Sequence, residues 1–260
     1  MATTIAAIYR YPVKGLSPEP LDCVALAPGA CLPEDRRFAL ALASTRFDPA
    51  RPEWLPKTAF AMLMRDAALA RLDTRFDPET AELTIAQGGT TLLHACLTDP
   101  AGCLAVGDFV GAFLGDSVAR PLRVVAAPGH AFADARRKAN AATDQYVSLI
   151  NLNSIAALAD AIGAPVERLR FRANVYFAGD VPAWEELDWL GRDITLGGAR
   201  LKVIAAITRC AATKVNPATA ERDLDIPAAL QRHFGHNLMG VYAEVAAGGE
   251  IAAGDPLIIP

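Results

Sequence analysis

Apolar and polar residues alternate over short stretches that glycine or proline interrupts, a pattern typical of β-strands. Two pairs of these stretches flank Gly88-Gly89 and Gly197-Gly198, and each pair is predicted to form a hairpin. The predicted strands cover 3–10, 36–43, 81–86, 90–94, 121–127, 170–177, 193–196, 199–207, 240–246 and 256–259. Short strands at close spacing with glycine turns predict a β-barrel.

Two stretches favour helices instead. Apolar residues at helical spacing predict a short helix over 106–115. A second helix is predicted from an N-cap at Ser154 to Ile162, with Gly163 in the position that follows a helix end. Helices are therefore few, and the chain is expected to be β-rich.

A polar, alanine-rich and basic segment over 129–143 divides the chain near its middle. At 260 residues the chain is long enough for one large domain or two small ones. The segment is predicted to be a surface loop or a linker. We therefore expect a first domain over 1–125 and a second over 126–260.

Composition narrows the class of protein. Apolar residues make up 52% and charged residues 21%, which is typical of a globular protein and argues against disorder. The net charge of −4 gives no indication of the basic surface that a nucleic-acid-binding protein needs. No apolar stretch approaches the ~20 residues that a membrane span needs, and no signal-peptide pattern opens the chain.

The five cysteines are odd in number and include no C-x-x-C pair. A disulfide framework is therefore not expected. We expect a reducing, cytoplasmic location instead. A ferredoxin-type iron–sulfur site is excluded because it needs four closely spaced cysteines. The four histidines form no H-E-x-x-H pattern, and no phosphate-binding glycine loop or G-x-S-x-G nucleophile motif occurs.

Cys210 is the first candidate for chemistry. It follows a predicted hairpin strand and has Arg209 and Lys214 close by in sequence. Cationic neighbours favour the thiolate, the form that acts as nucleophile and metal ligand. The alternative is a small buried apolar side chain at a strand end.

A second set of candidates is basic. Arg172 and Asn174 lie two residues apart on a predicted strand and share a face, so together they suit a phosphate or the edge of a heterocycle. Lys14 and Arg36 lie at predicted strand ends or turns, where binding groups are often presented. Gly15 would allow a ligand to approach the backbone. The alternatives are a solvated strand face and ordinary surface charges.

Five motifs, taken in order, resemble those of MOSC-domain proteins. They are Tyr11-Pro12-Val13-Lys14-Gly15, Asp35-Arg36, Phe171-Arg172-Ala173-Asn174, Thr208-Arg209-Cys210 and Lys214-Val215-Asn216-Pro217. The resemblance covers nearly the whole chain and is closest to the branch with the mitochondrial amidoxime-reducing component and its bacterial relatives. It implies a mixed α/β, β-rich fold: a β-barrel MOSC domain packed with a MOSC-associated β-rich N-terminal domain.

The resemblance also implies a molybdenum cofactor, Mo-molybdopterin. The residue matching Cys210 ligates the metal beside the dithiolene sulfurs, and thiolates suit such a metal. Asp144 falls where the family has an acid close to the metal. The residues expected to hold the pterin and its phosphate are Lys14, Gly15, Arg36, Ser148, Arg172, Asn174, Thr208 and Arg209. The mitochondrial members carry Ser at the positions of Gly15 and Thr208; Gly15 would offer its backbone N–H, and Thr208 keeps a hydroxyl.

The implied activity is the reduction of N-hydroxylated compounds, such as amidoximes and hydroxylamines. Cys210 would tune the metal, Arg172 and Asn174 would orient the cofactor, and Asp144 would assist proton delivery. Electrons would come from a separate ferredoxin- or cytochrome-type protein with its reductase, since no ferredoxin-like segment follows the motifs. A monomer is the expected state.

Two alternatives stay open. In the first, the protein carries the molybdenum cofactor or activated sulfur on Cys210 without turning over a substrate. In the second, the chain is a β-rich protein in which Cys210 is structural.

Overall fold

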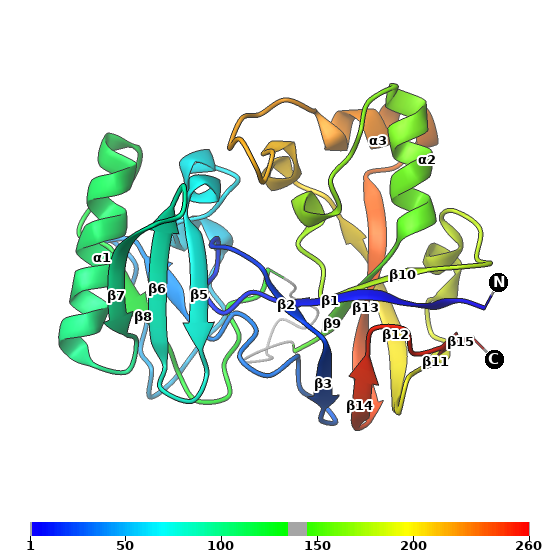
Figure 1. Ribbon diagram of the computed structural model, residues 1–260, viewed down its shortest axis with the longest axis horizontal. Helices are drawn as coiled ribbons and strands as arrows, with labels where there is room; N and C mark the ends of the chain where they lie inside the picture. The colour runs from blue at the N-terminus through cyan, green and yellow to red at the C-terminus, as the bar shows by residue number, and fades with distance from the viewer. Residues whose placement is uncertain (1, 135–144, 260) are drawn as a thin grey trace.

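A computed structural model describes residues 2–134 and 145–259 (Figure 1). Its strands are β1 Thr4–Arg10, β2 Glu19–Leu21, β3 Cys23–Leu26, β4 Ala39–Ala41, β5 Asp73–Asp77, β6 Glu82–Gln87, β7 Thr90–Cys96, β8 Arg123–Val125, β9 Val147–Asn151, β10 Val175–Ala178, β11 Asp193–Leu196, β12 Ala199–Thr208, β13 Leu238–Ala247, β14 Gly249–Ala252 and β15 Leu257–Ile258. The α-helices are α1 Pro100–Leu114, α2 Leu152–Ile162 and α3 Ile226–Phe234. The 3-10 helices are η1 Lys57–Ala59, η2 Ala67–Arg71, η3 Gly115–Ser117, η4 Arg168–Phe171, η5 Glu185–Trp189 and η6 Ala211–Lys214.

The larger part of the molecule is a curled eight-stranded sheet in the order β15-β11-β12-β13-β9-β10-β1-β2. Strands β9 and β10 pair in parallel, and the other neighbours are antiparallel. Its apolar core includes Leu149 on β9, Val203 on β12 and Val241 on β13, together with Trp189. We call this sheet with β3, β14, α2 and α3 the large region. The arrangement confirms the predicted mixed α/β, β-rich fold.

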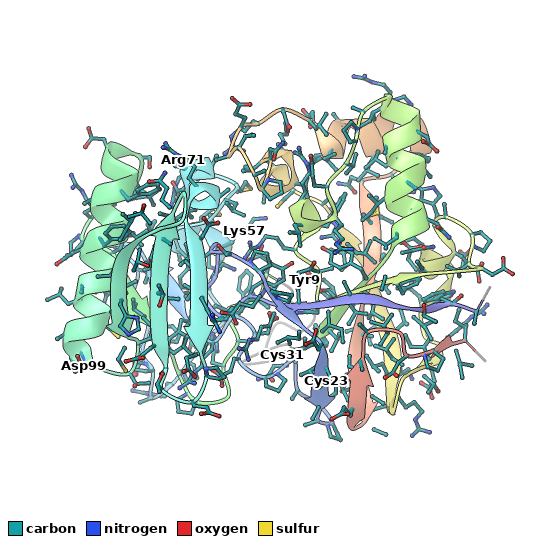
Figure 2. The ribbon with its side chains drawn as sticks, in the orientation of Figure 1. Tyr9, Cys23, Cys31, Lys57, Arg71 and Asp99 are labelled. Carbon is teal, nitrogen blue, oxygen red and sulfur yellow. The ribbon has the colours of Figure 1, made fainter. Side chains whose placement is uncertain are left out.

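The smaller part is a three-stranded sheet, β5-β6-β7, covered by α1 and joined to the β4–β8 pair. We call these elements, with η1, η2 and the segment between them, the small region. Asp99 is the N-cap of α1, and its carboxylate accepts from the Gly102 N–H at 3.1 Å (Figure 2). Gly107 lets α1 approach β8 closely, because a Cβ there would lie 2.3 Å from the Leu122 carbonyl oxygen. The helix is thus longer than the predicted 106–115, since Asp99 and Pro100 start it earlier.

The first strands of the chain belong to the large region. β1 pairs with β10 and β2 pairs with β1, while β3 pairs with β14 near the C-terminus. The chain then crosses to the small region after β3 (Figure 1). The division into 1–125 and 126–260 stays a prediction, and the strand pairing adds that the N-terminal strands lie in the sheet of the second part.

Several predicted elements are confirmed. Both glycine hairpins form, as β6–β7 and β11–β12, and α2 ends at Gly163 in the left-handed conformation. The N-cap of α2 is Asn151 rather than Ser154, because the Asn151 side chain accepts from the Asn153 N–H at 3.0 Å. Ser154 instead donates to the buried Glu186 carboxylate at 2.9 Å.

The predicted strand over 170–177 is wrong in its first half. Residues up to Phe171 form the 3-10 helix η4, Arg172 is left-handed with φ 53°, and β10 starts only at Val175. The alternation of apolar and polar residues therefore does not reflect two faces of a strand. Arg172 and Asn174 do not share a strand face, which corrects the geometric reason given for pairing them.

Within the described ranges 2–134 and 145–259, no helix is both long and apolar enough to cross a membrane.

Candidate functional site

A cavity of about 530 Å³ lies between the two regions. The small region contributes Lys57, which lies toward the large region in Figure 2, and the segment Met62–Met64. The large region contributes strands β9, β12 and β13 and the helices η4 and η6. Among the described residues, the charged side chains of the lining are six cations and two acids: Lys14, Arg36, Lys57, Arg170, Arg172, Arg209, Asp35 and Asp134. This lining is basic in a chain whose net charge is −4, and it suits an anionic ligand.

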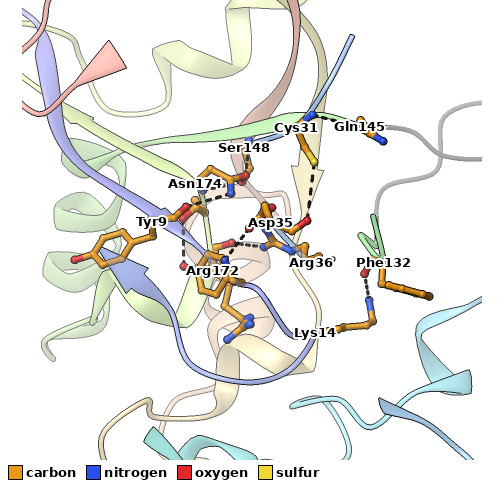
Figure 3. A network of polar contacts seen from close by, with 12 residues as sticks. Tyr9, Lys14, Cys31, Asp35, Arg36, Phe132, Gln145, Ser148, Arg172 and Asn174 are labelled. Atoms are coloured by element: carbon orange, nitrogen blue, oxygen red, sulfur yellow. Dashed lines mark hydrogen bonds and ion pairs between the residues drawn. The ribbon is translucent and has the colours of Figure 1, made fainter. Parts of the chain in front are cut away.

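Arg36 stands at the centre of the polar side of this cavity (Figure 3). One guanidinium nitrogen contacts the Asp35 carboxylate and another donates to the Arg172 carbonyl at 2.8 Å. Burial acts to lower the pKa of Arg36, but the adjacent Asp35 carboxylate outweighs burial and holds that pKa above its ordinary value. Asp35 is itself fixed because its other oxygen accepts from the Tyr11 N–H at 2.8 Å.

Arg172 differs from Arg36 in its partners. Its guanidinium carbon lies 4.3 Å from the centre of the buried Tyr11 ring, and that of Arg36 lies 4.6 Å from the same ring. No hydrogen bond or ion pair joins the Arg172 side chain to another residue of the described ranges. Burial, together with the nearby Arg36 charge, lowers the pKa of Arg172 to about 10. Because a partly buried cation without a counter-ion leaves a charge to be neutralised, Arg172 points to an anionic ligand.

Both arginines have left-handed backbones, each with φ 53°. A side chain other than glycine is strained there, by about 1 kcal/mol or more. Such positions persist only where surrounding contacts fix them, and they cluster at binding sites. The conformation turns Arg172 away from the line of β10 and toward the cavity.

Lys14 lies on the side of the cavity that borders the small region (Figure 3). Its ammonium donates to the Phe132 carbonyl at 2.8 Å and forms an ion pair with Asp134. Burial lowers the pKa of Lys14, and the Asp134 carboxylate opposes that shift. The next residue, Gly15, has φ +86°, and a Cβ there would lie 3.2 Å from the Ala61 carbonyl oxygen. The glycine therefore serves a close backbone approach as well as lining the cavity.

Asn174 and Ser148 form a buried pair at the base of the cavity (Figure 3). The side-chain amide oxygen of Asn174 accepts from the Ser148 N–H at 3.1 Å and from the Ser148 hydroxyl at 2.8 Å. The Asn174 amide nitrogen donates to the Tyr9 carbonyl at 3.2 Å. These bonds tie together β9, β1 and the segment that leads into β10, so both side chains support the site from within the sheet.

Arg209 is buried and bonded within the protein. Its guanidinium donates to the Phe171 carbonyl at 2.9 Å and, through two nitrogens, to the Met239 carbonyl. Burial lowers the pKa of Arg209. The side chain thus holds η4 against β13 and places the main chain of Thr208 to Cys210 at the cavity.

Cys210 follows β12 and precedes η6, and it lines the cavity with a free thiol. Its carbonyl accepts from the Thr213 N–H at 3.1 Å and from the Thr213 hydroxyl at 2.8 Å, which fixes the turn. Thr208, two residues earlier, is exposed and also lines the cavity. A free thiol beside a basic cavity is the arrangement that metal ligation by a single cysteine needs.

Asp144, expected near the metal, lies outside the described residues. The structure brings the other expected residues to one cavity: Lys14, Gly15, Arg36, Ser148, Arg172, Asn174, Thr208, Arg209 and Cys210.

Sequence reasoning missed four lining residues of note: Cys31, Lys57, Arg170 and Tyr242. Burial raises the pKa of the Cys31 thiol to about 12. Arg170 is bonded to the carboxylates of Glu167 and Asp223. Arg170 was placed on the polar face of the predicted strand, but only Arg172 and Asn174 on that face were chosen as binding residues. Lys57 carries no local pattern. Tyr242 lies in the stretch Gly240-Val241-Tyr242, which also fits the MOSC pattern but gives Tyr242 no binding role, and the fold brings both residues to the cavity.

Comparison with known proteins identifies a domain in the second half of the chain. The MOSC domain family model matches residues 132–258. Among solved structures, the YUAD protein from Bacillus subtilis aligns with a TM-score of 0.45 and 13% identity, over 99% of this chain and 94% of that chain. YiiM from Geobacillus stearothermophilus aligns with a TM-score of 0.35 and 22% identity, over 44% of this chain and 53% of that chain. No curated protein matches.

The chain therefore carries a MOSC domain over residues 132–258. The MOSC family is associated with binding of the molybdenum cofactor. The residues present fit that group: the cavity is rich in cations, Arg172 has no counter-ion among the described residues, and the Cys210 thiol lines the same cavity.

Proposed function

We propose that this protein binds the molybdenum cofactor in the cavity between its two regions and reduces N-hydroxylated compounds. The observation that carries the proposal is the presence, in one cavity, of the Cys210 thiol and of the Arg172 guanidinium, which pairs with no acid of the described ranges. The first suits a metal and the second suits a phosphate.

Each residue then has a distinct part in binding. Cys210 would ligate the metal, and Arg172 would hold the cofactor phosphate together with Lys14. Arg36 fixes the Arg172 carbonyl and stays cationic through Asp35, so it adds positive charge and orientation together. Arg209, Asn174 and Ser148 would hold these groups in place from beneath.

The cofactor, when bound, supplies two-electron redox chemistry, and the protein supplies orientation and electrostatics. Conversion of an N–OH group to N–H consumes two electrons and two protons and releases one water. We propose that the electrons come from a separate ferredoxin- or cytochrome-type protein. We also propose that Asp144 assists proton delivery, because it falls in the sequence where the family has an acid close to the metal.

The test is steady-state reduction of an aryl amidoxime by the cofactor-loaded protein with a reduced dye as electron donor. We expect amidine to form with the wild type and turnover to fall more than about 100-fold in Cys210→Ala, because loss of a group that merely supports a metal ligand already costs roughly 10- to 100-fold. The matched control is Cys23→Ala, since Cys23 is exposed on β3 and outside the cavity. A loaded protein that reduces neither amidoximes nor hydroxylamines would favour cofactor or sulfur carriage on Cys210.

A further inference from the structure

Arg222 ties the small region to the turn that carries Cys210. It lies between η6 and α3, and its exposed side chain reaches four main-chain carbonyls. One terminal nitrogen donates to Leu63 at 3.3 Å, Met64 at 2.9 Å and Arg65 at 3.3 Å. The other donates to the Ala211 carbonyl at 3.3 Å.

These carbonyls belong to two chain segments that border the cavity. Ala211 directly follows Cys210, whereas Leu63 and Met64 form part of the wall from the small region. A single guanidinium therefore sets the separation between the Cys210 turn and this apolar wall. The fork geometry of arginine allows several carbonyls to be bound at once, which an ammonium on a flexible stem cannot reproduce.

The wall held in this way is thin. A second cavity of about 290 Å³ adjoins the first, and both are lined by Gly15, Leu63, Arg170, Arg172 and Ala212. Leu16, Leu69 and Val215 give the second cavity an apolar part beside the two arginines. Because Leu63 and Ala212 line both cavities, a change in their separation would alter the boundary between the two spaces.

We propose that Arg222 is a positioning residue that keeps the Leu63–Met64 wall close to the Cys210 turn, so that a slim, uncharged apolar group is selected beside Cys210. Leu63 and Met64 offer apolar surface, whereas the cations Lys14 and Arg36 line only the first cavity. The part that concerns substrate rests on the proposed function. The part that concerns access to the Cys210 thiol does not.

Thiol labelling tests access directly. The full chain is made in a host that does not synthesise the molybdenum cofactor, and is treated with iodoacetamide or with a bulky fluorescein maleimide. Peptide mass spectrometry follows Cys210, with exposed Cys23 as the internal reference. The variants are Arg222→Ala and Arg222→Lys, with Arg232→Ala on α3 as the matched exposed control.

We expect Arg222→Ala to raise the Cys210 rate with the bulky reagent about fivefold more than with the small one, as loss of one net hydrogen bond implies. Arg222→Lys should fall between Arg222→Ala and wild type, and Arg232→Ala should match wild type. Equal acceleration with both reagents, acceleration at Cys23 as well, or no change at Cys210 would each overturn the proposal, because a merely structural role predicts no change in size selectivity.

In the cofactor-loaded protein, Arg222→Ala should raise kcat/KM for an amidoxime with a bulky aryl group relative to one with a small alkyl group. An unchanged ratio would overturn the substrate-selecting role. Absence of turnover with both substrates in the wild type would overturn the proposed function, whereas the labelling result would still decide the role of Arg222.

Discussion

The two sides of the cavity use buried polar groups in opposite ways. Beneath the cavity, Arg209, Asn174 and Ser148 bond to main-chain carbonyls or to each other, and their bonding groups are occupied within the protein. Around Lys14, Arg36 and Arg172, described cations outnumber described acids, and Arg172 pairs with none of those acids. Satisfied polar groups hold a fold together, whereas an unsatisfied cation in a cavity marks where a ligand supplies the missing partner.

The largest effect should follow from breaking the satisfied side at Arg209. Arg209→Ala leaves the buried carbonyls of Phe171 and Met239 without these partners. We expect the free energy of unfolding to fall by about 3 kcal/mol, measured by urea unfolding. Arg192→Ala, at an exposed position, is the control and should change little. A loss below about 1 kcal/mol for Arg209→Ala would contradict the structural role.

The next effect concerns Asn174. Asn174→Ala removes the bonds that the Asn174 side chain makes with Ser148 and with the Tyr9 carbonyl, and should lower the free energy of unfolding by about 2 kcal/mol. Ser148→Ala should cost less, because the Ser148 main chain keeps one of its bonds to Asn174. Unchanged stability in Asn174→Ala together with lost cofactor binding would move Asn174 from the supporting residues to the ligand-binding ones.

Arg172→Ala should show the reverse pattern. Because its guanidinium pairs with no acid of the described ranges, we expect the free energy of unfolding to change by less than about 1 kcal/mol. The affinity for sulfate, a probe for phosphate, should fall about tenfold, since a charge-assisted bond is worth about 1.5–3 kcal/mol. The concentration dependence of the thermal midpoint in sulfate measures this affinity. If Arg172→Ala lost much stability but still bound sulfate as well as wild type, Arg172 would be a supporting residue like Arg209, and the proposed difference between the two sides of the cavity would be wrong.

The smallest effect is a pH dependence. Burial lowers the pKa of Arg172 to about 10, so its guanidinium is charged at neutral pH and loses its proton as the pH rises through about 10. Sulfate binding by the wild type should therefore stay level between about pH 7 and 9 and decline above that. The decline should be shallower in Arg172→Ala. Identical profiles for the two proteins would assign the decline to other groups.

The sequence predicts the strands with local signals best. Gly88-Gly89 and Gly197-Gly198 mark hairpins because two-residue glycine turns suit the twist of paired strands. The region around Arg172 misleads for a physical reason: alternation of polar and apolar residues also arises in a 3-10 turn that packs Phe171 inward. The long-range pairing of β3 with β14 leaves no local pattern, and it was not predicted.

The candidate site is likewise predicted where a local sequence signal exists and not where long-range contacts decide. Short motifs indicate Lys14, Arg36, Arg172 and Cys210, and the fold gathers them at one cavity. Their separate tasks depend on contacts that no local pattern encodes. Arg209 and Arg172 are both arginines in the recognised motifs, yet the structure gives internal hydrogen bonds to Arg209 and pairs Arg172 with no acid of the described ranges.

Molybdenum content per protein tests the central claim most directly. Wild type, Cys210→Ala and Cys23→Ala would be purified from a host that makes the cofactor and examined by elemental analysis. Ligation of the metal by Cys210 predicts near-stoichiometric molybdenum in wild type and Cys23→Ala, and much less in Cys210→Ala. Wild-type protein without molybdenum, or Cys210→Ala with full metal content, would contradict it.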